Sequence, residues 1–256
     1  MNTDSHVSVS VVSHGQIELV EILLRDLAAH VKTPIEFLLT VNVPETPPMG
    51  LSQFAFPTRV LCNAEPRGFG ANHNAAFRES RSEFFCVMNP DIRIEHDPFP
   101  ALLACLQDWR AGVVAPLIRS PSGAIEDSAR HFPTPWTILR KTVHASPKVE
   151  YPVRGNPVYP DWVAGMFMLF PREVFAEIGG FDEKYFLYYE DVDLCARLTS
   201  RGRRVVLCPA ATVVHEARRQ SRHSFRYLRW HLVSMVRFFL SRPAQLSPAR
   251  KVKKVK

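Results

Sequence analysis

The residues best suited to chemistry form a run of carboxylates that directly follows a group of aromatic side chains. Glu190 and Asp191 come immediately after Tyr188 and Tyr189, where the pattern predicts the start of a helix. Apolar surroundings raise the pKa of a carboxylate, whereas the positive end of a helix favours its ionised form. A carboxylate that experiences both effects can serve as a base, unlike a carboxylate that is simply exposed to solvent.

Helix geometry separates the acidic residues of this run. Asp191 and Asp193 are about 200° apart around a helix, so they point to nearly opposite sides. Asp193 stands four residues before Arg197, and a surface ion pair of this spacing is sufficient to explain it. Asp191 is compatible with capping of the helix and with proton transfer at the same time.

Other polar residues follow short apolar runs that predict buried strands. The carboxyl ends of such strands form the ligand-binding edge of an open α/β sheet. A simple turn also explains an Asn-Pro-Asp sequence at this position. The residues concerned are Ser13 and His14 after residues 7–12, Asn42 and Glu45 after residues 35–41, and Asn89 and Asp91 after residues 84–88.

The elements that must position these residues alternate along the chain. Apolar residues at helical spacing between positions 20 and 31 separate two strand patterns, and further strand patterns at 58–63 and 83–88 flank a helix near 70–80. Asp97 and Pro98 begin another helix that is expected to reach about residue 110. Residues 162–170 read as one strand. This alternation predicts an α/β fold with a mostly parallel open sheet flanked by helices.

The order of these motifs resembles the family 2 glycosyltransferases of the GT-A fold, and is most similar to their rhamnosyltransferase-like branch. The resemblance covers roughly residues 7–215. It is carried by Asn-Pro-Asp at 89–91, Gly-Gly-Phe-Asp-Glu at 179–183, Glu-Asp-Val-Asp-Leu at 190–194, the segment 63–74 and the segment 162–170. No one of these motifs is decisive, but their combination and order are specific.

The resemblance implies an inverting enzyme that moves a sugar from a nucleotide-diphospho-sugar, with dTDP-rhamnose the favoured donor, to a glycan or lipid-linked acceptor in cell-surface polysaccharide synthesis. Asp191 matches the catalytic base, and Glu190 supports it or contacts the acceptor. Asp91 and His215, which ends an apolar strand, would hold Mg²⁺ or Mn²⁺, although a lone histidine there is often structural. Arg67, Gly68, Asn72 and Gly165 would border the donor, beside the strand-end residues above, and Trp162 would line the acceptor pocket or fill the core.

Two positions depart from the pattern that the resemblance implies. Asn89 stands where many relatives carry the first aspartate of an Asp-x-Asp motif, which leaves a single carboxylate for the cation. Asn42 stands where many relatives carry an aspartate that reads the base. An amide offers both a donor and an acceptor, so the identity of the base is left open.

The basic residues concentrate near the C-terminus. The formal net charge is +7 and the sequence pI is about 9.3. Residues 221–256 are expected to form a basic amphipathic helix and tail outside a catalytic domain at 1–220. Its apolar stripe is Phe225, Leu228, Leu232, Val236 and Phe239. This helix suits an anionic membrane surface, and packing on the domain explains its stripe equally well.

Composition and leader patterns place limits on function and location. The five cysteines lack a Cys-x-x-Cys pair, which predicts thiols in a reducing compartment, and residues 1–12 do not resemble a signal peptide. We therefore expect a cytoplasmic protein, with the inner face of the cytoplasmic membrane as a second expected location. The chain does not interleave aromatic and basic residues on a strand, so no nucleic acid is expected. The alternatives are a nucleotidyltransferase of the same fold and a non-catalytic domain that binds glycan or membrane.

Overall fold

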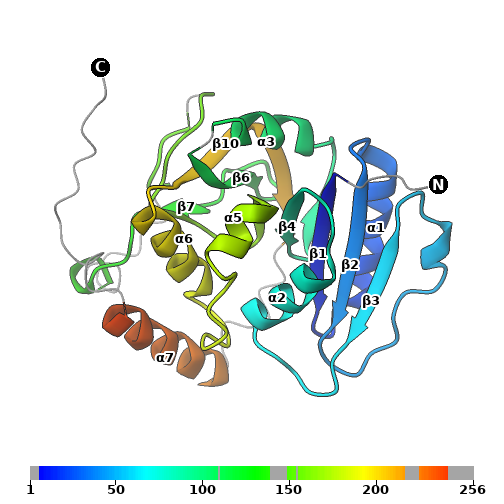
Figure 1. Cartoon of the computed structure of the whole chain (residues 1–256), viewed down its shortest axis with the longest axis horizontal. Helices are drawn as coiled ribbons and strands as arrows, with labels where there is room; N and C mark the ends of the chain where they lie inside the picture. The colour runs from blue at the N-terminus through cyan, green and yellow to red at the C-terminus, as the bar shows by residue number, and fades with distance from the viewer. Residues whose placement is uncertain (1–5, 109, 139–148, 154, 217–224, 242–256) are drawn as a thin grey trace.

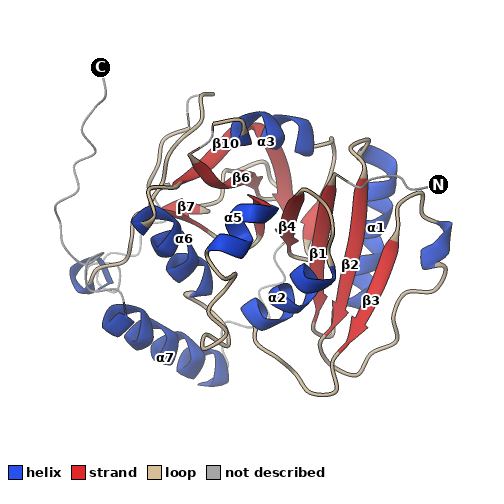
Figure 2. Cartoon of the chain, viewed as in Figure 1, coloured by secondary structure: helices blue, strands red, loops and turns tan. Residues whose placement is uncertain are grey.

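The computed structural model describes residues 6–108, 110–138, 149–153, 155–216 and 225–241 (Figure 1). One sheet carries eight strands in the order β3-β2-β1-β4-β9-β6-β10-β5, and a second sheet pairs β7 with β8. Figure 2 shows β3, β2, β1 and β4 side by side. The strands are β1 (Val7–Ser13), β2 (Ile35–Val41), β3 (Thr58–Cys62), β4 (Phe84–Met88), β5 (Ile92–Arg93), β6 (Ala111–Arg119), β7 (Ala129–Arg130), β8 (Trp162–Val163), β9 (Phe167–Pro171) and β10 (Arg204–His215). The helices are α1 (Ile17–His30), α2 (Phe69–Glu79), α3 (Phe99–Leu106), α5 (Arg172–Glu177), α6 (Glu190–Ser200) and α7 (Phe225–Ser241), with a 3-10 turn η1 (Leu51–Gln53).

The large sheet is mostly parallel, as the alternating pattern predicts. β1 lies between β2 and β4 and is parallel to both, and β6 is parallel to β10. β9 runs antiparallel to its neighbours β4 and β6. The continuous apolar runs of β1 and β2 reflect burial on both faces, because α1 and α3 contribute to the core on one face while α2, α5 and α6 contribute to the core on the other. The α/β prediction is therefore confirmed.

Two predicted elements differ from the structure. The single strand expected at 162–170 is divided, because a turn at Gly165 and Met166 separates β8 from β9, and β8 pairs with β7. The backbone N–H of Ala164 donates to the carbonyl of Ser128, which fixes this departure from the main sheet. The helix that begins after Asp97 ends at Leu106 and not near residue 110, although Asp97 does accept a hydrogen bond from the N–H of Phe99.

The Gly-Gly-Phe sequence has a packing role that is visible in the structure. Asn74 on α2 accepts a hydrogen bond from the N–H of Phe181 and donates one to its carbonyl, both at 2.9 Å. Gly180 has a φ of 66°, and a Cβ at this position would collide with the Asn74 side chain. Glycine is required here because it tolerates both the backbone conformation and the close approach. The motif thus ties the segment that precedes α6 to α2.

The ion pair between Asp193 and Arg197 is buried, which corrects the prediction of a surface pair. The Asp193 side chain is 0% exposed and that of Arg197 is 13% exposed, with Arg197 Nε 2.8 Å from the carboxylate. Arg197 also donates to the carbonyl of Ile178. The sequence spacing was correct, but it does not show which side of α6 faces the core.

We predict that Asp193→Asn destabilises the protein by about 3 kcal/mol or more, because it leaves the buried guanidinium of Arg197 without its counter-charge. Urea unfolding measures the free energy. Glu21→Gln is the matched control, since the Glu21–Arg25 pair has the same i,i+4 spacing on α1 but side chains that are 42% and 71% exposed. The control should cost less than about 0.5 kcal/mol. Equal losses in both variants would contradict the burial of the Asp193 pair.

Candidate active site

Asp191 is fixed in place by two backbone groups. Its carboxylate accepts hydrogen bonds from the N–H of Gly165 at 3.0 Å and from the N–H of Val192 at 2.8 Å. Burial raises the pKa of Asp191, while these hydrogen bonds and the charge of Arg130 act in the opposite direction. A carboxylate with a raised pKa and a fixed orientation has the properties of a general base.

Glu190 lies beside Asp191 but has a different environment. It is 5% exposed, and its Oε2 atom is buried without a hydrogen-bond partner among the described residues. Burial raises its pKa well above the usual range, and the neighbouring Asp191 adds to the effect. Two adjacent carboxyl groups with little solvent favour sharing a single negative charge. Glu190 is therefore suited to supporting Asp191 as a neutral acid.

A second centre joins Asp91, His215 and Glu126. His215 Nε2 lies 3.2 Å from Asp91 Oδ2, and His215 Nδ1 lies 2.8 Å from Glu126 Oε2. Burial alone would lower the pKa of His215, but the hydrogen bonds and charges of the two carboxylates outweigh it and raise the pKa to about 9. The sequence predicts Asp91 and His215 but not Glu126, which belongs to no recognisable motif and reaches the histidine only through the fold.

The residues of this centre fit a hard divalent cation. Asp91 Oδ1 is buried without a partner in the described structure, and the adjacent imidazole offers a nitrogen ligand. Within the described segments no group of three or more His, Cys, Asp or Glu residues is arranged to hold a metal alone. Two protein ligands suit Mg²⁺ or Mn²⁺, because these cations commonly complete their coordination with water and substrate phosphates.

Asn42 is the centre of a third group, at the ends of β1 and β2. Its Oδ1 accepts from the N–H of Arg67 at 2.8 Å, and its Nδ2 lies 3.0 Å from both the Arg67 carbonyl and His14 Nδ1. Asn72 also donates to the Arg67 carbonyl, at 3.2 Å. Glu45 accepts from the N–H of Gly15 at 3.1 Å. The contacts of Asn42 and Asn72 with Arg67 hold the loop at Arg67 and Gly68 against the sheet.

The remaining predicted residues occupy distinct positions. Ser13 is fully buried and accepts from the N–H of Gln16, so its side chain serves the start of α1. Trp162 donates from its indole to the His131 carbonyl, and the Arg130 guanidinium lies 5.4 Å from its ring centroid. Asn89 donates its backbone N–H to Met166, next to Gly165. This last bond links the Asp91 strand end to the Asp191 side of the site.

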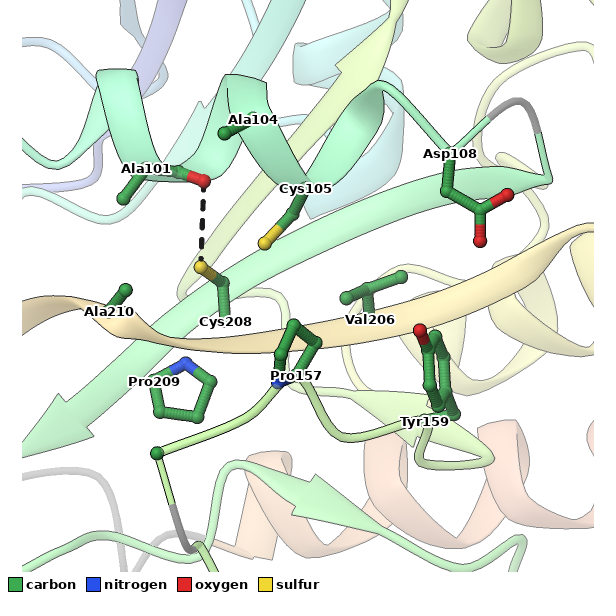
Figure 3. Close-up of a pocket in the computed structure, with 11 residues that line it drawn as sticks. Ala101, Ala104, Cys105, Asp108, Pro157, Tyr159, Val206, Cys208, Pro209 and Ala210 are labelled. Carbon is green, nitrogen blue, oxygen red and sulfur yellow. Dashed lines mark hydrogen bonds between the residues drawn. The ribbon is translucent and has the colours of Figure 1, made fainter.

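A cavity of about 370 Å³ lies elsewhere, between α3 and β10 (Figure 3). Its wall includes the thiols of Cys105 and Cys208, and Cys208 Sγ donates to the Ala101 carbonyl at 3.6 Å. The lining is largely apolar and contains none of the predicted site residues. The polar groups that could perform chemistry are therefore at the strand ends and not in this cavity.

Solved structures with this arrangement define the class of the fold. The chain superposes on GalNAc-T7 bound to UDP, GalNAc and Mn²⁺ with a TM-score of 0.67 and 15% identity, covering 94% of this chain and 52% of that one. It also superposes on the mannosyltransferase PcManGT of Pyrobaculum calidifontis, in complex with GDP-Man and Mn²⁺, with a TM-score of 0.64 and 17% identity, covering 92% and 65% of the two chains. The fold is the GT-A fold of glycosyltransferases.

Sequence comparison gives the family. Residues 52–231 match the profile of "Glycosyltransferase like family 2". The chain is 33% identical over 183 residues to the rhamnosyltransferase WbbL of Escherichia coli (strain K12), covering 67% of this chain and 69% of WbbL. It is 36% identical over 151 residues to N-acetylglucosaminyl-diphospho-decaprenol L-rhamnosyltransferase of Mycobacterium tuberculosis (strain ATCC 25618 / H37Rv), covering 52% of this chain and 47% of that protein. The chain belongs to glycosyltransferase family 2.

We predict that His215 makes the stability of the cation-free protein depend on pH. Its pKa is about 9 in the folded state and 6.5 for an unperturbed histidine, so folding takes up a proton between these values. The stabilisation is complete below about pH 6.5 and is lost as the pH rises through about 9. Over this window the free energy of unfolding should fall with a slope of at most about 1.4 kcal/mol per pH unit.

Urea unfolding in the presence of a chelator measures this slope. His215→Gln should flatten it. His6→Gln should leave it unchanged, because His6 is a surface histidine 42% exposed beside Glu83. The same slope in the wild type and in His215→Gln would show that another group is responsible.

Proposed function

We propose that the chain is an inverting glycosyltransferase that moves a sugar, rhamnose from dTDP-rhamnose, to a glycan or lipid-linked acceptor of a cell-surface polysaccharide. The proposal rests mainly on the environment of Asp191. Its Oδ2 accepts a hydrogen bond from the Gly165 N–H, and the carboxyl group of Glu190 is adjacent. The named activities of the rhamnosyltransferase relatives support the choice of sugar and acceptor. The raised pKa of Asp191 favours a base over a permanently ionised surface group.

In this reaction Asp191 accepts the proton of the acceptor hydroxyl as the oxygen attacks the anomeric carbon. The attack comes from the side opposite the nucleotide diphosphate, so the configuration inverts. The hydrogen bonds from Gly165 and Val192 occupy one direction on each carboxylate oxygen and leave further lone pairs for the proton. Glu190, as a neutral acid, avoids a second charge beside the base.

Asp91 and His215 would hold Mg²⁺ or Mn²⁺ in this scheme. The bound cation supplies positive charge that neutralises the diphosphate leaving group. Glu126 accepts a hydrogen bond from the Nδ1–H of His215, which would leave Nε2, beside Asp91, available as a nitrogen ligand for the cation. The protein would supply two ligands to the cation, which is consistent with donor phosphates as further ligands.

The donor would lie along the loop fixed by Asn42. Hydrogen bonds join this loop to Asn42 and Asn72, and Asn42 also contacts His14. A nucleotide that binds there would therefore meet a preformed surface. The acceptor would approach from the side of Trp162, whose ring carries the Arg130 guanidinium. An aromatic ring beside a cation is suited to a sugar attached to an anionic carrier.

The outer face of α7 is proposed to contact an anionic membrane. Its apolar side chains are unusually exposed: Phe225 91%, Leu228 55%, Leu232 47%, Val236 53% and Leu240 79%. We call these five residues the outer face. Arg226 and Arg229, also exposed, lie on the same helix and provide positive charge. Apolar side chains with flanking cations match the interfacial binding mode. Within the described segments, no helix is both long and apolar enough to cross a bilayer.

We predict that Asp191→Asn reduces transfer by more than about tenfold while donor affinity stays nearly the same, because the amide retains the shape of aspartate without its basicity. Product formation from dTDP-rhamnose measures transfer, and calorimetry with dTDP measures affinity. Asp108→Asn is the matched control at a surface pair with Arg204 away from the site. Retention of more than about a tenth of wild-type transfer would remove Asp191 from the role of base.

A second prediction tests the cation. Asp91→Ala should weaken Mn²⁺-dependent binding of dTDP strongly, and His215→Ala should weaken it less, because Asp91 supplies the anionic ligand. Calorimetry with Mn²⁺ or with excess chelator measures the difference, and Asp108→Asn again serves as the control. Unchanged binding in both variants, or full wild-type transfer in excess chelator, would exclude a cation held by these residues.

A further inference from the structure

α7 packs on the turn that leads into α6 (residues 185–189) through the side of the helix that carries Ser234 and Phe238, which we call the inner face. Figure 1 shows α7 beside α6. Phe238 is fully buried in a small core with Tyr185 and Tyr189 from the turn and Val192 and Ala196 from α6. This face is the opposite side of the helix from the outer face. Of the apolar stripe predicted from the sequence, Phe239 packs against this core, whereas the other four side chains are exposed.

The turn itself has an unfavourable backbone conformation. Tyr188 and Tyr189 have φ values of 69° and 67°, and they are the only described residues other than glycine with positive φ. Consecutive left-handed residues with bulky side chains cost conformational free energy and persist only where surrounding contacts impose them. Asp191 follows this pair by two residues, so a relaxed turn would change where α6 begins.

α7 supplies contacts along the whole turn. Ser234 Oγ donates to the Leu187 carbonyl at 2.9 Å, and Ser234 is 4% exposed. The Trp230 ring stacks on Phe186 at 4.6 Å between centroids. His231 lies 5.4 Å from the rings of both Tyr188 and Tyr189. These contacts, with Phe238, hold the turn from its first residue to its last.

The opposite side of the turn contacts both halves of the active site. The Phe186 carbonyl accepts from the N–H of Phe69 at 2.9 Å, and a Cβ at Gly68 would be 2.8 Å from the same oxygen. The Tyr189 carbonyl accepts from the N–H of Asp193 in the first turn of α6, at 2.8 Å. A shift of the turn would therefore move the donor loop and the proposed base together.

We infer that α7 is part of the active site's support, with Ser234 and Phe238 as positioning residues that hold the strained turn and thereby place Asp191. The kinetic part of this inference rests on the proposed function, whereas the structural part does not. Since the outer face of the same helix is the proposed membrane contact, docking of α7 and placement of the base are properties of one element. The position of Asp191 then depends on whether α7 is packed on the catalytic domain.

Ser234→Ala and Phe238→Leu test the inference in the full chain. Both should increase hydrogen–deuterium exchange at the backbone amides of residues 187–193. With dTDP-rhamnose and a water-soluble acceptor, kcat should fall at least about fivefold, because small displacements of a catalytic group are costly, while the donor KM stays within about twofold. Val233→Ala is the matched control: Val233 is on α7, 55% exposed, and outside the outer face as defined.

The outcomes separate the two proposals. Unchanged exchange at 187–193 in both inner-face variants, or the same loss of kcat in Val233→Ala, overturns the positioning role. If the wild type and both variants lack transferase activity, the proposed function is refuted. The positioning role still stands if exchange at residues 187–193 is higher in the variants than in the wild type. Flotation with phosphatidylglycerol vesicles should be weakened by Leu232→Ser but not by Ser234→Ala. Equal flotation of wild type and Leu232→Ser removes the membrane contact, and with it the coupling of docking to base placement.

Discussion

The hydrogen bond from the Gly165 N–H to the Asp191 carboxylate is the interaction on which the site depends. It joins the turn between β8 and β9 to the start of α6. The adjacent Met166 carbonyl accepts from Asn89, which brings the end of β4 into the same unit. The break in the strand predicted at 162–170 makes this bond possible, because a continuous strand would place the Gly165 N–H in the sheet ladder. A departure from regular structure thus orients the proposed base.

Much of the fold could be predicted because buried strands and amphipathic helices leave strong periodic patterns. The association of Asp91 with His215 was predicted through the resemblance to family 2 glycosyltransferases, because a strand end alone does not specify its partner. Glu126 was not, because it precedes β7 without any periodic or motif context and meets His215 across 89 residues of chain. Contacts of this kind depend on tertiary geometry that spacing does not encode.

Two patterns in the C-terminal part of the chain show a different limit of sequence-based prediction. One is the spacing of acidic and basic residues in α6, and the other is the amphipathic pattern of α7. The spacing of Asp193 and Arg197 predicted their pair, but the side of α6 that faces the core depends on its neighbours. In α7 the aliphatic stripe is the exposed one, whereas the packed side is built from Trp230, His231, Ser234 and Phe238. A hydrophobicity pattern ranks Ser and His as polar, so it left membrane contact and packing open for the stripe and did not identify the face that packs on the turn.

Histidine 215 lies between two carboxylates that would otherwise repel one another in a partly buried place. With a pKa near 9 it carries a positive charge at neutral pH, so the centre contains its own counter-ion before any metal arrives. Without a cation, the imidazolium therefore offsets part of the negative charge of Asp91 and Glu126. A divalent cation that bound there would displace the proton on His215 Nε2, so the net charge of the centre would rise by only one unit.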